Sequence, residues 1–172
     1  MPRVSAADGL AELLDRQHSV ASRGQLLALG LKDDAMQYRM RPGGPWQALL
    51  PGVYLAASGV PSFPQKEMAA LLYAGQGSLV TGPVALMHYS IRSVPAGDVI
   101  DVLMPASRQR LSSGFARLHR TTRLPTRSSS SGPVRIALAP RAVADTARLL
   151  TTLRDIRAVV ADATGILEIK VK

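Results

Sequence analysis

Two carboxylates and a lysine near the end of the chain have the residue types of a catalytic metal site. Asp162 is followed by the triplet Glu168-Ile169-Lys170. In metal-dependent nucleases, such carboxylates hold Mg²⁺ and the lysine positions water or stabilises charge. Glu168 and Lys170 face the same side if this segment is a strand. Glu-x-Lys is common by chance, however, and a nuclease core needs elements beyond it. We therefore expect an ordinary strand over 166–172, with a metal-dependent nuclease as the alternative function.

The other reactive residue types form no catalytic or metal-binding pattern. The three histidines, His18, His88 and His119, are not paired at metal-ligand spacing, and the chain has no cysteine. Cysteine-ligated zinc, iron–sulfur clusters and a cysteine nucleophile are therefore excluded. We expect His18 to cap a helix end and His119 to lie on a basic strand. The serine run 128–131 lacks the Gly-x-Ser-x-Gly surroundings of an activated serine and predicts a flexible loop. We expect no enzyme activity, no metal and no cofactor.

Positive charge is concentrated in one part of the sequence. Of the formal net charge of +9, all comes from residues 104–157, which contain eleven arginines and only two acidic residues, Asp145 and Asp155. This concentration favours a polyanionic partner. Six of these arginines form the predicted basic patch: Arg108, Arg110, Arg117, Arg120, Arg123 and Arg127. They would contact DNA phosphates, or instead an acidic protein or RNA, and the sequence leaves both readings open.

Composition predicts a folded, cytoplasmic protein. The 172 residues are 47% hydrophobic but only 4% aromatic, so aliphatic side chains must build the core. Asp8, Glu12 and Asp15 interrupt any signal-peptide core near the start. Residues 68–91 carry no formal charge, but glycines and a proline break this stretch twice, which favours two short buried helices over a membrane span.

The first 57 residues predict a winged helix-turn-helix. Leu10, Leu13 and Leu14 share one face of a helix over 8–17. Ser22 and Gln25 have the spacing of a capping box for a helix over 23–29, which Gly30 ends. A third helix follows and ends before residue 42; strands over 46–50 and 53–56 form the wing. The expected core of this domain consists of Leu13, Leu26, Met36, Met40, Trp46 and Leu49.

In such a module, the third helix enters the major groove of DNA and the wing lies beside the phosphates. Gln37, Tyr38 and Arg41 are the candidates for the groove, because glutamine can bind adenine and arginine guanine through two hydrogen bonds each. Ser22 and Arg23 begin the second helix, where a phosphate can bind. The complete set of predicted DNA-binding residues is Ser22, Arg23, Lys32, Gln37, Tyr38, Arg39, Arg41 and Gln47.

A linker over 57–64 is expected to separate this domain (1–57) from a small mixed α/β domain (65–172). The fold class is therefore α+β. In the second domain, the pattern predicts helices over 65–74, 83–89, 140–150 and 153–163, and strands over 99–104, 115–121, 134–138 and 166–172.

In their order along the chain, several segments resemble the AbiEi-type antitoxins of type IV toxin–antitoxin systems, in their actinobacterial form. The most specific segment is Trp46-Gln47-Ala48-Leu49-Leu50-Pro51-Gly52-Val53-Tyr54. The others are Leu13-Leu14, 18–26, 69–75, 102–105, 119–125 and 140–150, so the resemblance covers residues 9 to about 163.

The resemblance implies a DNA-binding domain that represses the promoter of its own operon, and a second domain that counters a nucleotidyltransferase-like toxin. That toxin is a functional partner and need not be a physical one. Two features differ from the family. The third helix begins with Lys32-Asp33-Asp34, where many members are rich in arginine. Longer members also continue past the position of Ala163, so we expect a shortened second domain.

Overall fold

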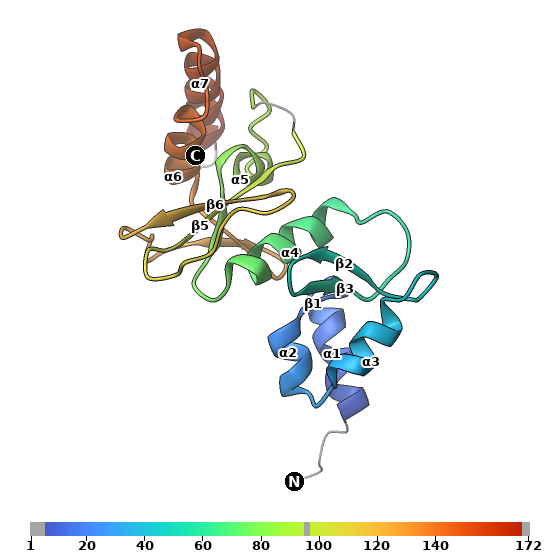
Figure 1. Cartoon of the computed structure of the whole chain (residues 1–172). Helices are drawn as coiled ribbons and strands as arrows, with labels where there is room; N and C mark the ends of the chain where they lie inside the picture. The colour runs from blue at the N-terminus through green and yellow to red at the C-terminus, as the bar shows by residue number, and fades with distance from the viewer. Residues whose placement is uncertain (1–5, 95–96, 170–172) are drawn as a thin grey trace. The chain divides into compact units, whose positions relative to one another are not determined.

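The computed structural model describes residues 6–94 and 97–169, which form a mixed α+β protein with seven helices and two sheets (Figure 1). The α+β class predicted from the sequence is therefore confirmed. The chain divides into two compact units, Met1–Gln76 and Gly77–Lys172.

The first unit combines four helices with a small antiparallel sheet. Its elements are α1 (Ala6–Arg16), β1 (Val20–Ser22), α2 (Arg23–Ala28), α3 (Asp33–Arg39), β2 (Gln47–Leu50), β3 (Val53–Leu55) and α4 (Phe63–Ala74). The strand order is β1-β3-β2, so β3 pairs with both neighbours.

Local sequence signals account for most of these boundaries. The Ser22 hydroxyl accepts a hydrogen bond from the Gln25 amide, and the Gln25 side chain accepts one from the Ser22 amide, which completes the predicted capping box. Gly30 ends the turn after α2 with a φ of +85°, in the left-handed region that favours glycine. His18 and Ser19 also have positive φ, 53° and 63°, and they separate α1 from β1.

The core of the first unit forms where α2, α3 and the strands meet. Leu26 and Met36 are fully buried, Trp46 is 9% exposed, and all three pack with Ala21. Most of the predicted core residues therefore belong to one cluster, which Leu13 and Met40 join as partly buried members.

The prediction for Leu49 was wrong: Leu49 is half-buried and Leu50 is buried instead. The pairing of β2 with β3 shifts register between Ala48 and Leu50. Such an irregularity reverses the side-chain alternation that simple strand periodicity assumes.

Helix α4 lies in the first unit, whereas the sequence placed residues 65–74 in the second domain. It packs against β1, β2 and β3. Met68, Ala69 and Ala70 on this helix are buried. Because α4 packs on this sheet, the division between the units falls after Gln76 rather than in the expected linker.

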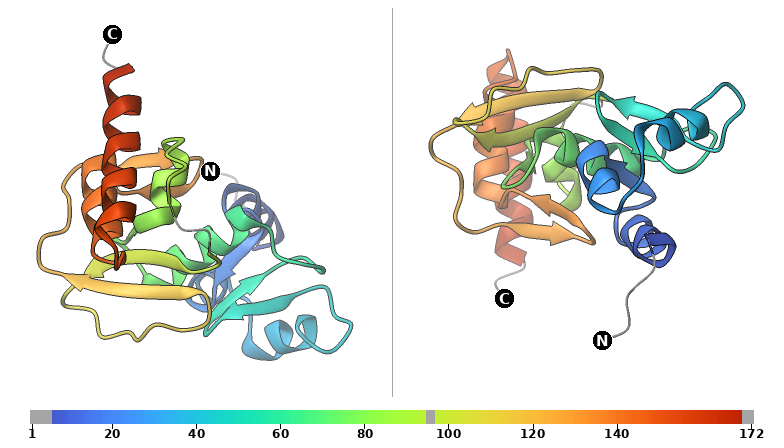
Figure 2. Two further views of the ribbon diagram at one scale, coloured as in Figure 1. Left: turned by 90° about the horizontal axis from the view of Figure 1, so that it is seen from above. Right: turned by 60° about the horizontal axis from the view of Figure 1, so that its bottom comes forward.

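The second unit contains a mixed five-stranded sheet and three helices (Figure 2). Its elements are β4 (Leu79–Thr81), α5 (Gly82–His88), β5 (Ile100–Pro105), β6 (Ala116–Thr121), β7 (Ser129–Ser131), β8 (Val134–Ile136), α6 (Ala139–Ala147) and α7 (Leu153–Ile169). The strand order is β6-β5-β4-β8-β7, with β5–β6 and β4–β8 parallel and the other pairs antiparallel. Helix α6 packs against both α5 and α7.

Two predictions for the second unit were wrong. Residues 166–169 continue α7 rather than form a strand. Gly165 inside this helix costs only about 1 kcal/mol relative to alanine, and burial of Val159 and Ala163 keeps the helix against the unit. The serine run is not a loop, because β7 pairs with β8 through its backbone at the sheet edge. Lys170, Val171 and Lys172 lie outside the described residues.

None of the described helices is both long and apolar enough to cross a bilayer. The uncharged stretch over 68–91 divides between α4, β4 and α5.

Candidate functional site

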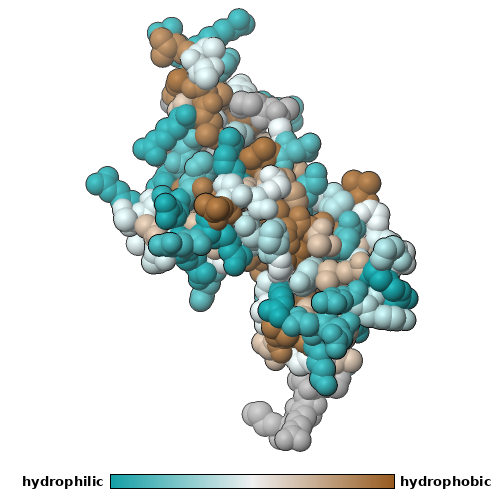
Figure 3. Space-filling model, in the orientation of Figure 1, coloured by the Kyte–Doolittle hydropathy of each residue, from teal (hydrophilic) through white to brown (hydrophobic). Residues whose placement is uncertain are grey.

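Helix α3 presents a continuous exposed side. Met36 is buried in the core, whereas Asp33, Asp34, Gln37 and Tyr38 are exposed, in keeping with the helical repeat. Arg41 follows the helix and is exposed as well. Hydrophilic side chains gather over α2 and α3 on the face seen in Figure 3. The structure therefore places the predicted groove residues Gln37, Tyr38 and Arg41 side by side in solvent.

Arg41 and Tyr38 form a preorganised pair. The Arg41 guanidinium lies 3.7 Å from the centroid of the Tyr38 ring, and its Nη1 donates a 2.8 Å hydrogen bond to the Tyr38 carbonyl oxygen. Tyr38 is 66% exposed. Stacking limits the conformations of the arginine. Arg41 therefore loses less side-chain entropy when a partner binds its remaining N–H groups.

Arg39 has a different environment from Arg41. Its Nη1 donates to the Ala35 carbonyl oxygen at 3.0 Å, and its guanidinium lies 5.4 Å from the Trp46 ring centroid. Arg39 is only partly exposed. It therefore covers the indole of the core and is not placed beside Gln37 and Arg41.

Three other predicted DNA-binding side chains already have partners within the first unit. The Ser22 hydroxyl caps α2. The Arg23 side chain binds Asp33 through Nε–Oδ1 (2.9 Å) and Nη2–Oδ2 (2.5 Å), and the hydrogen bond to Asp33 raises the Arg23 pKa. The Gln47 amide donates to the carbonyl oxygens of Ala57 (3.0 Å) and Gly59 (2.8 Å).

The ion pair between Arg23 and Asp33 changes the charge near α3. Asp33 remains exposed, but Arg23 at the start of α2 neutralises its carboxylate. Lys32, the exposed N-cap residue of α3, adds a positive charge at the same end of the helix as Asp34. The acidic beginning of this helix is therefore largely balanced by neighbouring cations.

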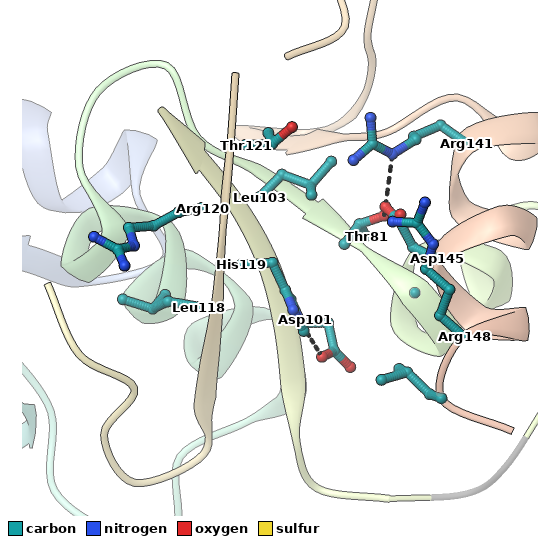
Figure 4. A pocket seen from close by; sticks show the side chains of 12 residues that line it. Thr81, Asp101, Leu103, Leu118, His119, Arg120, Thr121, Arg141, Asp145 and Arg148 are labelled. Carbon is teal, nitrogen blue, oxygen red and sulfur yellow. Dashed lines mark hydrogen bonds and ion pairs between the residues drawn. The ribbon is translucent and has the colours of Figure 1, made fainter. Parts of the chain in front are cut away.

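The six arginines of the predicted basic patch are all exposed, but they do not form one surface. Arg117 and Arg120 are three residues apart on β6, so their side chains leave opposite faces of the sheet. Figure 4 shows Leu118 and Arg120 on the opposite side of β6 from His119. Arg108 and Arg110 precede β6, whereas Arg123 and Arg127 follow it.

The second unit contains a polar pocket of about 540 Å³ that was not predicted from the sequence (Figure 4). Its walls are β5 and β6 on one side and α6 on the other, with the junction of β4 and α5 between them. The polar side chains that face it are Thr81, Asp101, His119, Arg141, Asp145 and Arg148.

Asp101 is the buried charge of this pocket. Its side chain is 1% exposed and accepts hydrogen bonds from Arg117 Nε (2.6 Å) and Arg117 Nη2 (3.0 Å). His119 Nε2 lies 2.6 Å from the same carboxylate. Burial raises the pKa of Asp101, but the hydrogen bonds from His119 and Arg117 outweigh it and hold the pKa below its ordinary value.

Gly82 makes room for this carboxylate. Its φ is +67°, and a Cβ atom there would lie 3.2 Å from the Cβ of Asp101 and 3.3 Å from Oδ2. A larger residue would therefore be strained in its backbone and would press on Asp101.

Asp145 organises the opposite wall. Its Oδ2 accepts hydrogen bonds from the Thr81 hydroxyl at 2.7 Å and from Arg141 Nε at 2.9 Å. Arg141 Nη1 also donates to the Arg123 carbonyl oxygen at 3.1 Å. These bonds join α6 to β4 and to the segment after β6.

The pKa of Asp101 predicts a loss of stability in acid. A carboxylate whose folded pKa is depressed binds fewer protons than in the unfolded chain, so its contribution is complete above the ordinary pKa of about 3.9. That contribution is lost as the pH falls below 3.9 through the folded pKa. Urea unfolding at pH 6 and pH 3 should show a smaller acid-induced loss for Asp101→Asn than for wild type. An equal loss in both proteins would contradict this.

Of the three residues in the alternative nuclease hypothesis, only Asp162 has a side chain that the structure describes. The Asp162 carboxylate accepts hydrogen bonds from the backbone amides of Arg92 (2.9 Å) and Ser93 (3.0 Å), and these bonds lower its pKa. Glu168 belongs to a helix rather than a strand. Among the side chains that the structure describes, which exclude that of Glu168, no three from His, Asp or Glu are grouped so that they could hold a metal ion.

The sequence contained one signal for the pocket. Arg141, Asp145 and Arg148 are spaced at i, i+4 and i+7, so a helix brings them to one face. Nothing in the sequence indicates that this face meets Asp101 and His119. Protein-family models give no match to the chain, and a search of curated proteins gives none either.

Proposed function

We propose that the first unit is a winged helix-turn-helix that binds duplex DNA, and that the protein is a repressor and antitoxin that regulates its own operon. The observation that carries this proposal is the exposed side of α3, which follows α2 after a tight turn and precedes the β2–β3 hairpin. A recognition helix needs one buried and one solvent-facing side, and α3 has both.

In this proposal, Gln37 and Arg41 read base edges, and Tyr38 holds Arg41 in position through their stacked contact. Lys32 contacts a phosphate. Arg23 acts indirectly, because it neutralises Asp33 at the start of α3. Gln47 supports the segment after β3 rather than the DNA.

The exposed arginines Arg108, Arg120, Arg123 and Arg127 would add affinity for phosphates without sequence preference. Each phosphate contact makes binding weaker at higher salt. Arg117 contributes less in this proposal than the others, because its guanidinium is bound to Asp101.

The antitoxin role rests on the family resemblance of the sequence. It makes a nucleotidyltransferase-like toxin the functional partner, and co-expression of this protein with the product of the neighbouring gene would test it through cell growth.

Replacement of Arg41 by alanine should relax sequence preference. We expect the substitution to weaken the binding free energy by about 1–3 kcal/mol for duplex DNA from upstream of the protein's own gene, and by much less for random duplexes. Fluorescence anisotropy at two salt concentrations measures both. Arg16→Ala is the matched control, since Arg16 is an exposed arginine at the end of α1 that pairs only with Glu12 among the described residues.

Equal affinity of the wild type for upstream and random duplexes, together with no effect of Arg41→Ala, would contradict a recognition role for α3. An Arg16→Ala loss as large as that of Arg41→Ala would indicate a general charge effect and would also contradict it.

A further inference from the structure

The pocket of the second unit has two polar walls that face each other. Arg141, Asp145 and Arg148 come from one side of α6 and its end, and Thr81, Asp101 and His119 come from the strands (Figure 4). Leu103 and Leu149 add apolar surface to the lining. A volume of about 540 Å³ is within the range of small-molecule sites in proteins.

The charges of this pocket do not cancel. Asp101 is neutralised by Arg117, and Asp145 by Arg141. Arg148 also lines the pocket, and its side chain makes no ion pair or hydrogen bond with any residue in the described part of the chain. One guanidinium is therefore left over beside two carboxylates whose charges are already matched.

Further hydrogen-bond donors face the same space. Arg141 uses Nε for Asp145 and Nη1 for the Arg123 carbonyl, which leaves Nη2. His119 uses Nε2 for Asp101, and its Nδ1 is a donor only when the imidazole carries both protons. A cationic ligand would find the Asp101 oxygens occupied by Arg117 and His119, whereas an oxyanion would find Arg148 and the Nη2 group of Arg141.

We propose that this pocket binds a phosphate monoester, with Arg148 as the principal cation, Arg141 as an additional donor, and His119 as a donor when its imidazole is protonated. The rest of the ligand lies against Leu103 and Leu149. The same chemistry is found in a small phosphorylated metabolite and in the 5′-phosphate of a nucleic acid strand. This site belongs entirely to the second unit and does not depend on DNA binding by α3.

Isothermal titration calorimetry of the full chain tests the site with inorganic phosphate and adenosine 5′-monophosphate. The wild type should bind with a measurable heat, and Arg148→Gln should weaken binding by about tenfold or more, since a charge-assisted contact is lost. Arg157→Gln is the matched control, because Arg157 is an exposed arginine on α7 that does not line the pocket. Thermal melting should show that both variants remain folded, as both side chains are exposed.

A pair of single-stranded oligonucleotides, one with a 5′-phosphate and one with a 5′-hydroxyl, identifies the source of the phosphate. Tighter binding of the phosphorylated strand than of the nucleotide would support a nucleic acid end, and the reverse would support a metabolite. No binding of phosphate or nucleotide at millimolar concentration would overturn the proposal. Equal weakening by Arg148→Gln and Arg157→Gln would overturn it as well, because it would reflect net charge alone.

Discussion

Replacement of Trp46 by alanine should lower the free energy of unfolding of the first unit by about 3–5 kcal/mol, the usual cost of removing a large aromatic side chain from a core. Trp46 is 9% exposed and packs in one cluster with Ala21, Leu26 and Met36. Its removal leaves a cavity between α3 and the strands, and it also removes the aromatic surface that the Arg39 guanidinium covers.

Urea unfolding followed by circular dichroism measures this loss without relying on the fluorescence of the residue that is removed. Val60→Ala is the control, because Val60 is 94% exposed and a surface change of this kind alters stability by no more than about 0.5 kcal/mol. A loss below 1 kcal/mol for Trp46→Ala would mean that the indole is not a core side chain.

Asp101→Asn should destabilise the second unit by about 2–3 kcal/mol, somewhat below the cost of breaking a fully buried ion pair. The substitution keeps the shape of the side chain but removes the charge that Arg117 and His119 bind. The loss is smaller than for a fully buried pair because the side chains of Arg117 and His119 are 45% and 38% exposed. Water can therefore solvate part of the positive charge that loses its partner.

A double-mutant cycle with Arg117→Gln separates this ion pair from other effects. If the loss comes from an uncompensated guanidinium, the double variant should be more stable than the sum of the two single losses predicts. Additive losses would show that Asp101 contributes through other contacts.

Local signals in the sequence were sufficient for the first three helices and the β2–β3 hairpin of the first unit, but not for β1. The capping box of Ser22 and Gln25, the glycine that ends α2 and the apolar spacing of Leu26 and Met36 each depend on residues a few positions apart. Interactions at such short range hardly depend on the rest of the fold, so sequence periodicity reports them directly.

Predictions based on local pattern alone were wrong where packing between distant segments decides the outcome. The alternation of residues 166–169 resembles a strand, yet the burial of Val159 and Ala163 favours one long helix. Ser129–Ser131 has little strand propensity of its own and becomes a strand because β8 offers it backbone partners. Likewise, only its packing on the first sheet assigns α4 to the first unit.

The candidate sites divide in the same way. The sequence by itself determined which side of α3 faces solvent, because helix geometry and the burial of Met36 fix that side. It also determined that Arg141, Asp145 and Arg148 share a helix face.

Only the tertiary structure decided that Arg23 neutralises Asp33, that Gln47 binds the segment after β3, and that Arg117 is held by Asp101. The pocket joins Thr81 to Asp145 across 64 positions, and no local spacing can encode such a contact, because the pairing of the strands and the docking of α6 create it.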